Sequence, residues 1–308
     1  LNWIRLPIPF WAIEKYPDEP FLEKVAWKYA LKAFKWARKY GLRVNLDLHT
    51  IPGSQNGYNH SGKGGAGGQV NFLHGPMGLA NAQRTLDYIR IITEFISQPE
   101  YAPVVPMFGF INEALAATIG VEQITSFYVQ VHDMIREITG RGQGKGPFLS
   151  IHDSFRGLAA WKDLMPGHDR VALDVHPYLI FVNVDRTSLN SQIQKPCRSW
   201  AADMNSSWTD FGVSMAGEFS LAINDCGLWI NGVGAGTRWE GTFNGQGDGV
   251  AGSCAEWNDW QSWTQDRKDD FRAFALRNFD ALGHWFFWTW KIVRGIRPLA
   301  TGQMDLQV

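Results

Sequence analysis

The chain has 308 residues, of which 45% are hydrophobic, and this is enough to bury the core of one α/β barrel domain. Its formal net charge is −1, so its charge does not favour nucleic acid or an anionic membrane surface as a partner. No segment has the length and apolar character of a transmembrane helix, and we therefore expect no membrane insertion.

The aromatic content is high, with 15 Trp, 19 Phe and 8 Tyr among 14% aromatic residues. Aromatic rings stack on the C–H faces of sugars, so this composition favours a carbohydrate ligand over other small molecules. Buried aromatic side chains are also ordinary core material, and composition alone does not separate the two uses.

Apolar runs and amphipathic segments alternate along the first half of the chain. A strand is predicted over residues 2–8, with Arg5 in its middle, and the next strand ends at Asp47-Leu48-His49. A long Gly-rich polar loop follows, and loops of that size in compact domains usually carry function. Strands are predicted over 2–8, 44–48, 104–111, 147–151 and 171–175, and helices over 21–40, 79–97 and 121–139.

The second half continues the alternation with weaker helices. A short helical piece over 158–164 precedes the fifth strand, and Pro196 interrupts the helix expected over 187–204. Strands over 213–219 and 284–288 flank a helix over 267–282. The pattern of seven strands predicts an α/β fold, a (β/α)8 TIM barrel that is one strand short in this chain. A doubly wound sheet is the alternative, but polar residues at the end of nearly every strand favour the barrel. We expect one domain, residues 1–308.

Polar residues follow most of these strands, and strand ends of a barrel face one pocket. Glu113 and Glu218 each end a buried apolar run, far apart in sequence. Two carboxyl groups facing one pocket suit glycoside hydrolysis, where one protonates the leaving oxygen and the other meets the cationic anomeric carbon. The residues read from the strand ends are Arg5, His49, Asn112, Glu113, His176, Tyr178, Glu218 and Trp288. The pattern alone leaves open which Glu has which role.

These segments resemble glycoside hydrolase family 5, and within it the fungal exo-β-1,3-glucanases. The similar stretches include NWIRLPIPFWAIE, NLDLHTIPGSQNGYNHSG, FGFINEAL, LDVHPYLIF, AGEFSLAINDCGLWINGVGAGTRWEG and FFWTWK. The resemblance implies a retaining hydrolase that releases glucose from the non-reducing ends of β-1,3-glucan, with transglycosylation as a side reaction. The alternatives are a β-1,6-glucanase or β-glucosidase of the same clan, and a non-catalytic β-glucan-binding protein.

The same resemblance implies a role for each position. Glu113 would be the acid/base and Glu218 the nucleophile, ionised by Arg5 with Tyr178 nearby. The remaining roles concern the sugar: Asn112 would bind its 2-hydroxyl, His49 and His176 would line its subsite, Trp288 would lie beneath it, and Tyr58 with Phe181 would clamp the next glucose.

The resemblance also implies that this chain lacks the first strand of the barrel and is trimmed at both ends. Three positions depart from the family pattern. Tyr58 replaces Phe, Asn59 replaces Asp, and Thr50 replaces Gly. Asn59 and Asn205 begin glycosylation sequons, which fits a secreted or cell-wall protein whose signal peptide is not in this chain.

The three cysteines match no zinc or CxxC pattern. Cys226 and Cys254 flank a Gly- and Asn-rich loop, where a disulfide would staple a long insertion, and Cys197 then lacks a partner. No metal or other cofactor is expected, and we expect a monomer. The other histidines are expected to be structural or surface residues: His60, His74, His132, His152, His168 and His284.

Overall fold

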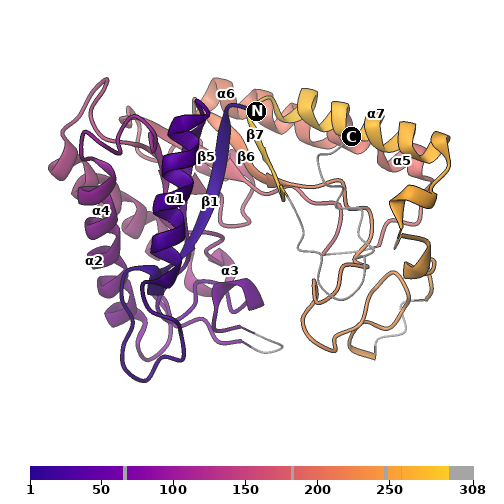
Figure 1. Ribbon diagram of the computed structural model, residues 1–308, viewed down its shortest axis with the longest axis horizontal. Helices are drawn as coiled ribbons and strands as arrows, with labels where there is room; N and C mark the ends of the chain where they lie inside the picture. Colours follow the sequence, from indigo (N-terminus) through magenta and orange to yellow (C-terminus); the bar gives the residue numbers. More distant parts are fainter. Residues whose placement is uncertain (65–67, 182–183, 246–248, 258, 291–308) are drawn as a thin grey trace. The chain divides into compact units, whose positions relative to one another are not determined.

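The computed structural model describes residues 1–64, 68–181, 184–245, 249–257 and 259–290 (Figure 1). The chain divides into two compact units. The first consists of Leu1–Val175 with Thr209–Ser214, and the second of His176–Trp208 with the described residues that follow Ser214.

In the part of the first unit that the structure describes, five parallel strands combine with three long helices and one short helix. Each strand pairs in parallel with the next along the chain, so sequence order and sheet order are the same. This is the pattern of repeated βα units, in which a helix connects each strand to a parallel neighbour. The strands are β1 (Trp3–Pro9), β2 (Arg43–Thr50), β3 (Met107–Gly109), β4 (Phe148–His152) and β5 (Val171–Val175), and the helices are α1 (Val25–Lys39), α2 (Gly78–Ile96), α3 (Ala116–Ile119) and α4 (Val121–Thr139).

Helix α1 shows how the sequence covers this sheet. It buries Ala30, Phe34 and Ala37 at helical spacing and runs alongside β1 (Figure 1). Its lysines lie on the exposed side, and the helix ends just before Gly41, whose φ of +71° suits glycine. The prediction of a helix over 21–40 is therefore confirmed in its core and too long at its start.

The alternation of β2 positions the polar side chains of the first unit. Val44, Leu46 and Leu48 are fully buried in the apolar core. The intervening residues point to the opposite face of the strand, and they include Asp47 and Asn45, which are almost as deeply buried. Buried polar side chains on one face indicate that this face lines a polar interior rather than the helix layer.

The second unit contains β6 (Ser214–Phe219), whose residues after Ser214 belong to it, and β7 (Trp285–Phe287), which pairs with β6 in parallel. Its principal helix is α7 (Gln265–Leu282), which begins with the side chain of Thr264 accepting the N–H of Arg267. The predicted helix over 187–204 is wrong as one element. The chain forms α5 (Leu189–Gln192), a π-type turn beginning at Pro196, and α6 (Ala201–Asp210), whose last two residues lie in the first unit.

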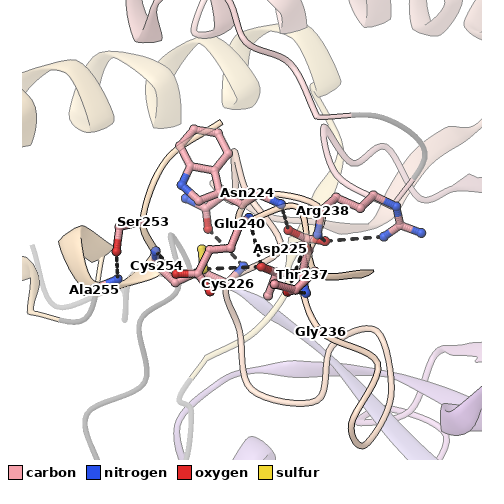
Figure 2. Close-up of a disulfide and its surroundings, with 12 residues drawn as sticks. Asn224, Asp225, Cys226, Gly236, Thr237, Arg238, Glu240, Ser253, Cys254 and Ala255 are labelled. Atoms are coloured by element: carbon pink, nitrogen blue, oxygen red, sulfur yellow. Dashed lines mark hydrogen bonds and ion pairs between the residues drawn. A yellow bond between two sulfur atoms is a disulfide. The ribbon is translucent and has the colours of Figure 1, made fainter. Parts of the chain in front are cut away.

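A disulfide joins Cys226 to Cys254, which confirms the predicted pairing (Figure 2). Beside it, the carboxylate of Asp225 accepts the backbone N–H groups of Arg238 and Trp239, at 2.7 and 3.0 Å. A buried carboxylate and a covalent link therefore hold the long insertion together where it lacks regular structure. Cys197 is a free, exposed thiol.

Several strands are shorter than their apolar runs. The run over 104–111 forms strand only at Met107–Gly109, because Val104 and Val105 close a turn that starts at Tyr101. The segment predicted as helix over 158–164 is a single 3-10 turn, Leu158–Trp161. Among the described residues, no helix is both long and apolar enough to cross a membrane.

Candidate active site

Asp47, near the end of β2, joins two of the predicted site residues, Arg5 within β1 and His49 of β2. Its Oδ2 atom lies 2.7 Å from Nδ1 of His49 and 3.1 Å from Nη2 of Arg5. The carboxylate accepts a hydrogen bond from Nδ1, so His49 presents Nε2 to its other side. The side chains of Arg5 and Asp47 are 4% and 2% exposed, and their charges therefore compensate each other away from bulk water. The sequence analysis did not assign a role to Asp47.

Asn112 is fixed by the same arginine. Its Oδ1 accepts a hydrogen bond of 2.7 Å from Nη2 of Arg5, which determines the orientation of the amide. Its Nδ2 is buried and has no hydrogen-bond partner among the described residues. A buried amide donor without a partner is costly unless a ligand accepts from it.

Glu113 follows in a left-handed backbone conformation, with φ of +50°. This conformation costs a non-glycine residue about 1–2 kcal/mol, so neighbouring contacts must hold it. Asn56 donates from Nδ2 to the Glu113 carbonyl at 3.1 Å. Gln55 donates from Nε2 to the main-chain carbonyls of His49 and Asn112, at 2.8 and 2.9 Å. The main-chain carbonyl of Gln55 accepts the N–H of Leu115.

We call Gln55 and Asn56 the amide clamp, because their side chains tie the loop after β2 to the segment that carries Glu113. Both residues are buried, and the three hydrogen bonds that their side chains donate to His49, Asn112 and Glu113 all end on main-chain oxygen atoms. They lie in the Gly-rich polar loop after β2, for which the sequence predicts a function but no individual site residue other than Tyr58. The clamp is therefore a finding of the structure.

His60 contacts the carboxyl group of Glu113. Its Nε2 lies 2.9 Å from Oε2 of Glu113, where the Glu113 side chain is 10% exposed. The ring is placed between His49 and Tyr58, with ring centroids 5.5 and 5.7 Å away. His60 is exposed, as expected of a surface residue, but it also contacts the proposed acid. It lies in a polar loop, and no periodic pattern in the sequence reveals this contact.

Tyr58 and Phe155 are two exposed aromatic side chains of the first unit. Both are exposed, at 43% and 47%, and their rings meet edge to face at 6.3 Å. Burial raises the pKa of Tyr58, and the negative charge of Glu113 raises it further. Phe155 has a φ of +60° and was missed in the sequence, although it closely follows the fourth strand.

In the second unit, Glu218 ends β6 and is 5% exposed. Its Oε2 accepts a hydrogen bond of 2.8 Å from the hydroxyl of Tyr178 and lies 3.7 Å from Nδ1 of His176. The His176 side chain is only 1% exposed. The structure thus brings two of the predicted residues, Tyr178 and His176, to the carboxylate of a third, Glu218.

The two other predicted residues of this unit, Trp288 and Phe181, contact the segments that carry Glu218 and Tyr178. The N–H of Trp288 donates to the carbonyl of Phe219, next to Glu218 in the chain, at 2.8 Å. Trp285 instead stacks on Phe279 at 4.2 Å and packs against Phe219, so it serves the core and leaves Trp288 as the better candidate of the pair. Phe181 is 43% exposed and meets the ring of Tyr178 at 5.3 Å.

One departure from the family pattern has a local explanation. The hydroxyl of Thr50 accepts the backbone N–H of Phe10 at 3.2 Å, and Thr50 is 5% exposed. The threonine therefore satisfies a buried main-chain donor that a glycine would leave to another partner.

Taken separately, neither unit contains, among its described residues, three His, Cys, Asp or Glu side chains placed to share a metal ion.

No family model matches the sequence, but individual proteins do. The chain is 36% identical over 310 residues to a probable glucan 1,3-beta-glucosidase D of Aspergillus flavus, covering 94% of this chain and 36% of the relative. It is 34% identical over 309 residues to glucan 1,3-beta-glucosidase D of Emericella nidulans, with the same coverage. The chain thus spans little more than a third of the length of these curated relatives.

Solved structures with lower identity share the fold. The chain matches a rutinosidase from Aspergillus niger with a TM-score of 0.66 at 14% identity, covering 98% of this chain and 75% of that one. It matches XacCel5A, solved in complex with cellopentaose, with a TM-score of 0.52 at 15% identity, covering 96% and 80%. This likeness confirms the α/β barrel fold predicted from the sequence.

Proposed function

We propose that this chain, which belongs to the family of the fungal glucan 1,3-β-glucosidases, is a retaining glycoside hydrolase that releases glucose from the non-reducing ends of β-1,3-glucan. The observation that carries the proposal is the identity of 34–36% across 94% of the chain, which spans both candidate carboxyl groups. The different surroundings of Glu113 and Glu218 support different roles for them.

Glu218 is the proposed nucleophile. The Tyr178 hydroxyl donates to its Oε2, and its carboxylate is the group that attacks the anomeric carbon. A hydrogen bond to the charged form stabilises a carboxylate, and a nucleophile must be ionised to react. Attack forms a bond between a carboxylate oxygen of Glu218 and the anomeric carbon while the bond from that carbon to the glycosidic oxygen breaks.

Glu113 is the proposed acid and base. In the first step its carboxyl proton passes to the departing glycosidic oxygen, and in the second step the resulting carboxylate takes a proton from water. That water attacks the anomeric carbon, and Glu218 leaves as a carboxylate. This two-step retaining mechanism requires the two carboxyl groups to lie about 5–5.5 Å apart, whereas an inverting enzyme requires about 6.5–9.5 Å.

The other residues would hold the sugar. The buried Nδ2 of Asn112 lacks a protein acceptor and is suited to donate to a hydroxyl oxygen of the sugar, in line with the 2-hydroxyl contact expected from the family. His49, oriented by Asp47, and His176 offer ring nitrogens to further hydroxyls. Trp288 would stack beneath the sugar, and Tyr58 with Phe181 would enclose the next glucose.

Incubation with laminarin and with pustulan tests the activity and the linkage. We expect glucose from laminarin with the β-anomer formed first, and Glu113→Gln or Glu218→Gln should reduce turnover by at least about a thousandfold. Glu122→Gln, an exposed glutamate at the start of α4, is the matched control and should remain fully active. Glucose from pustulan alone would transfer the proposal to β-1,6-glucan, and glucan binding without products would replace it with a binding protein.

We also propose that the protein works outside the cell or in the cell wall. The Cys226–Cys254 disulfide is typical of oxidising compartments, and the sequon residues Asn59 and Asn205 are exposed. Shift of the secreted protein on treatment with an endoglycosidase would test this, and a chain recovered only unglycosylated with both thiols reduced would contradict it.

A further inference from the structure

The hydrogen bonds around His60 determine which of its ring nitrogens carries a proton. Oδ1 of Asn56 accepts the N–H of Tyr58 at 2.9 Å, so the orientation of the Asn56 amide is fixed with its Nδ2 on the other side. That Nδ2 has two hydrogens and two neighbours: the Glu113 carbonyl at 3.1 Å and Nε2 of His60 at 3.1 Å. A donor faces Nε2, which must therefore offer its lone pair.

A ring nitrogen that offers its lone pair carries no proton, so His60 is neutral with its proton on Nδ1. The same Nε2 lies 2.9 Å from Oε2 of Glu113. If Glu113 were ionised, two lone pairs would face each other at hydrogen-bond distance. If Glu113 carries its proton on Oε2, the contact is a hydrogen bond from the carboxyl O–H to Nε2.

We infer that His60 is a positioning residue whose Nε2 accepts a hydrogen bond from the carboxyl O–H of Glu113 and so keeps this carboxyl group in its acid form between turnovers. The inference rests on the proposed function. When substrate binds, the glycosidic oxygen competes with Nε2 for the same proton, and that proton leaves with the departing group. Water returns a proton to Glu113 in the second step, and the contact with His60 forms again.

The neighbouring titratable groups of the first unit do not compete for this proton. Nδ1 of His49 already pairs with Asp47, and Asp47 is also paired with Arg5. The Tyr58 hydroxyl is uncharged in this range, since burial, and then the charge of Glu113, raises its pKa.

Among the described residues of the first unit, His152 is the remaining titratable neighbour considered, with a ring nitrogen within 4.8 Å of a Glu113 carboxyl oxygen. Its Nδ1 accepts the backbone N–H of Ser154 at 3.0 Å, so His152 is neutral with its proton on Nε2. It therefore offers a donor and leaves Nε2 of His60 as the acceptor beside the acid.

A pH profile of kcat/KM on a β-1,3-glucan oligosaccharide tests the inference by its sign. A hydrogen bond accepted from the neutral acid favours the protonated form, so His60→Ala should move the basic limb to lower pH, by about half a unit to one unit. His60→Gln, whose amide oxygen can accept, should restore part of the shift, and exposed His74→Gln is the control. A limb that moves to higher pH, or does not move, overturns the inference.

The leaving group provides a second readout that a merely structural role would not move. An aryl glucoside with a dinitrophenol leaving group needs no proton for its departure, so His60→Ala should retain kcat/KM on it within about twofold. On an alkyl glucoside the same variant should lose activity near the basic limb. Equal losses on both substrates would overturn the inference.

Nitrogen-15 spectra of the histidine rings separate the failure of this inference from failure of the proposed function. With the His60 signals assigned by comparison with His60→Gln, we expect a neutral ring with its proton on Nδ1 in the resting protein. A proton on Nε2, or an imidazolium ion, overturns the assignment whether or not the protein hydrolyses glucan. Conversely, the expected tautomer in a protein without hydrolase activity would refute the proposed function alone.

Discussion

Replacing Gln55 with Leu removes the two donors of the amide clamp while keeping the approximate volume of the side chain. The side chain is completely buried, and its Nε2 atom supplies both hydrogen bonds, to the carbonyls of His49 and Asn112. Both carbonyls belong to proposed site residues, His49 and Asn112. The substitution therefore tests whether the clamp holds the site as well as the fold.

The stability loss follows from the groups left behind. Each buried carbonyl left without its donor costs about 1–3 kcal/mol, or about 2–6 kcal/mol for the two. Leucine also removes Oε1 of Gln55, which has no partner among the described residues, and this returns about 1–3 kcal/mol. The net loss should be about 1–3 kcal/mol, or a fall in melting temperature of about 2 °C for each kcal/mol at this size.

Activity should fall as well as stability. The clamp holds the segment that carries Glu113 in its left-handed conformation, and a misplaced acid loses about tenfold to a hundredfold in kcat. Calorimetry and steady-state kinetics on the same samples measure both effects. Gln83→Leu, at an exposed position of α2, is the matched control. A Gln55→Leu protein with wild-type melting temperature and kcat would refute the reasoning about the clamp.

Three further outcomes follow from other parts of the structure. Burial raises the pKa of Asp185, but hydrogen bonds from Lys195 and Thr187 outweigh it and lower the pKa to about 2, so the stability that this carboxylate contributes is present above about pH 4 and lost as the pH falls toward 2. Urea unfolding should therefore show Lys195→Met to be less stable than the wild type at pH 6, with the difference vanishing near pH 2; a constant difference would contradict this. Replacing Cys226 and Cys254, 28 positions apart, with serine should cost about 3–4 kcal/mol by the loop-entropy relation, measured by the same method, and an unchanged midpoint would contradict it. Tyr58→Ala should raise KM for laminari-oligosaccharides several-fold with little change for an aryl glucoside, and equal effects on both would count against a role in binding the second glucose.

The sequence predicts the elements that carry Glu113 and Glu218 because both follow apolar runs. A buried strand in a parallel sheet is apolar throughout, so a carboxyl residue at its end is conspicuous. The same reasoning identified His49 and Arg5, and the structure pairs both with Asp47. Asp47 itself was overlooked because it lies within the strand, where only the alternation of faces shows that it points to the polar side.

The loop after β2 could not be predicted in the same way. Gln55 and His60 lie in a glycine-rich polar segment without periodicity, and their contacts depend on a fold of the main chain that includes Gly57, with φ of +74°. A side chain added at Gly57 would lie 2.5 Å from the Gly68 carbonyl. Such close backbone packing is decided by tertiary structure, which local patterns in the sequence do not encode.

The identity of the nucleophile is the central claim, and trapping with a 2-deoxy-2-fluoro-glucoside tests it most directly. The fluorine slows the second step, so a glucosyl ester accumulates and peptide mass mapping locates it. We expect one label per chain, on the peptide that contains Glu218, and no label on Glu218→Gln. A label on any other residue, or turnover of glucan by an enzyme that is never labelled, would contradict the account.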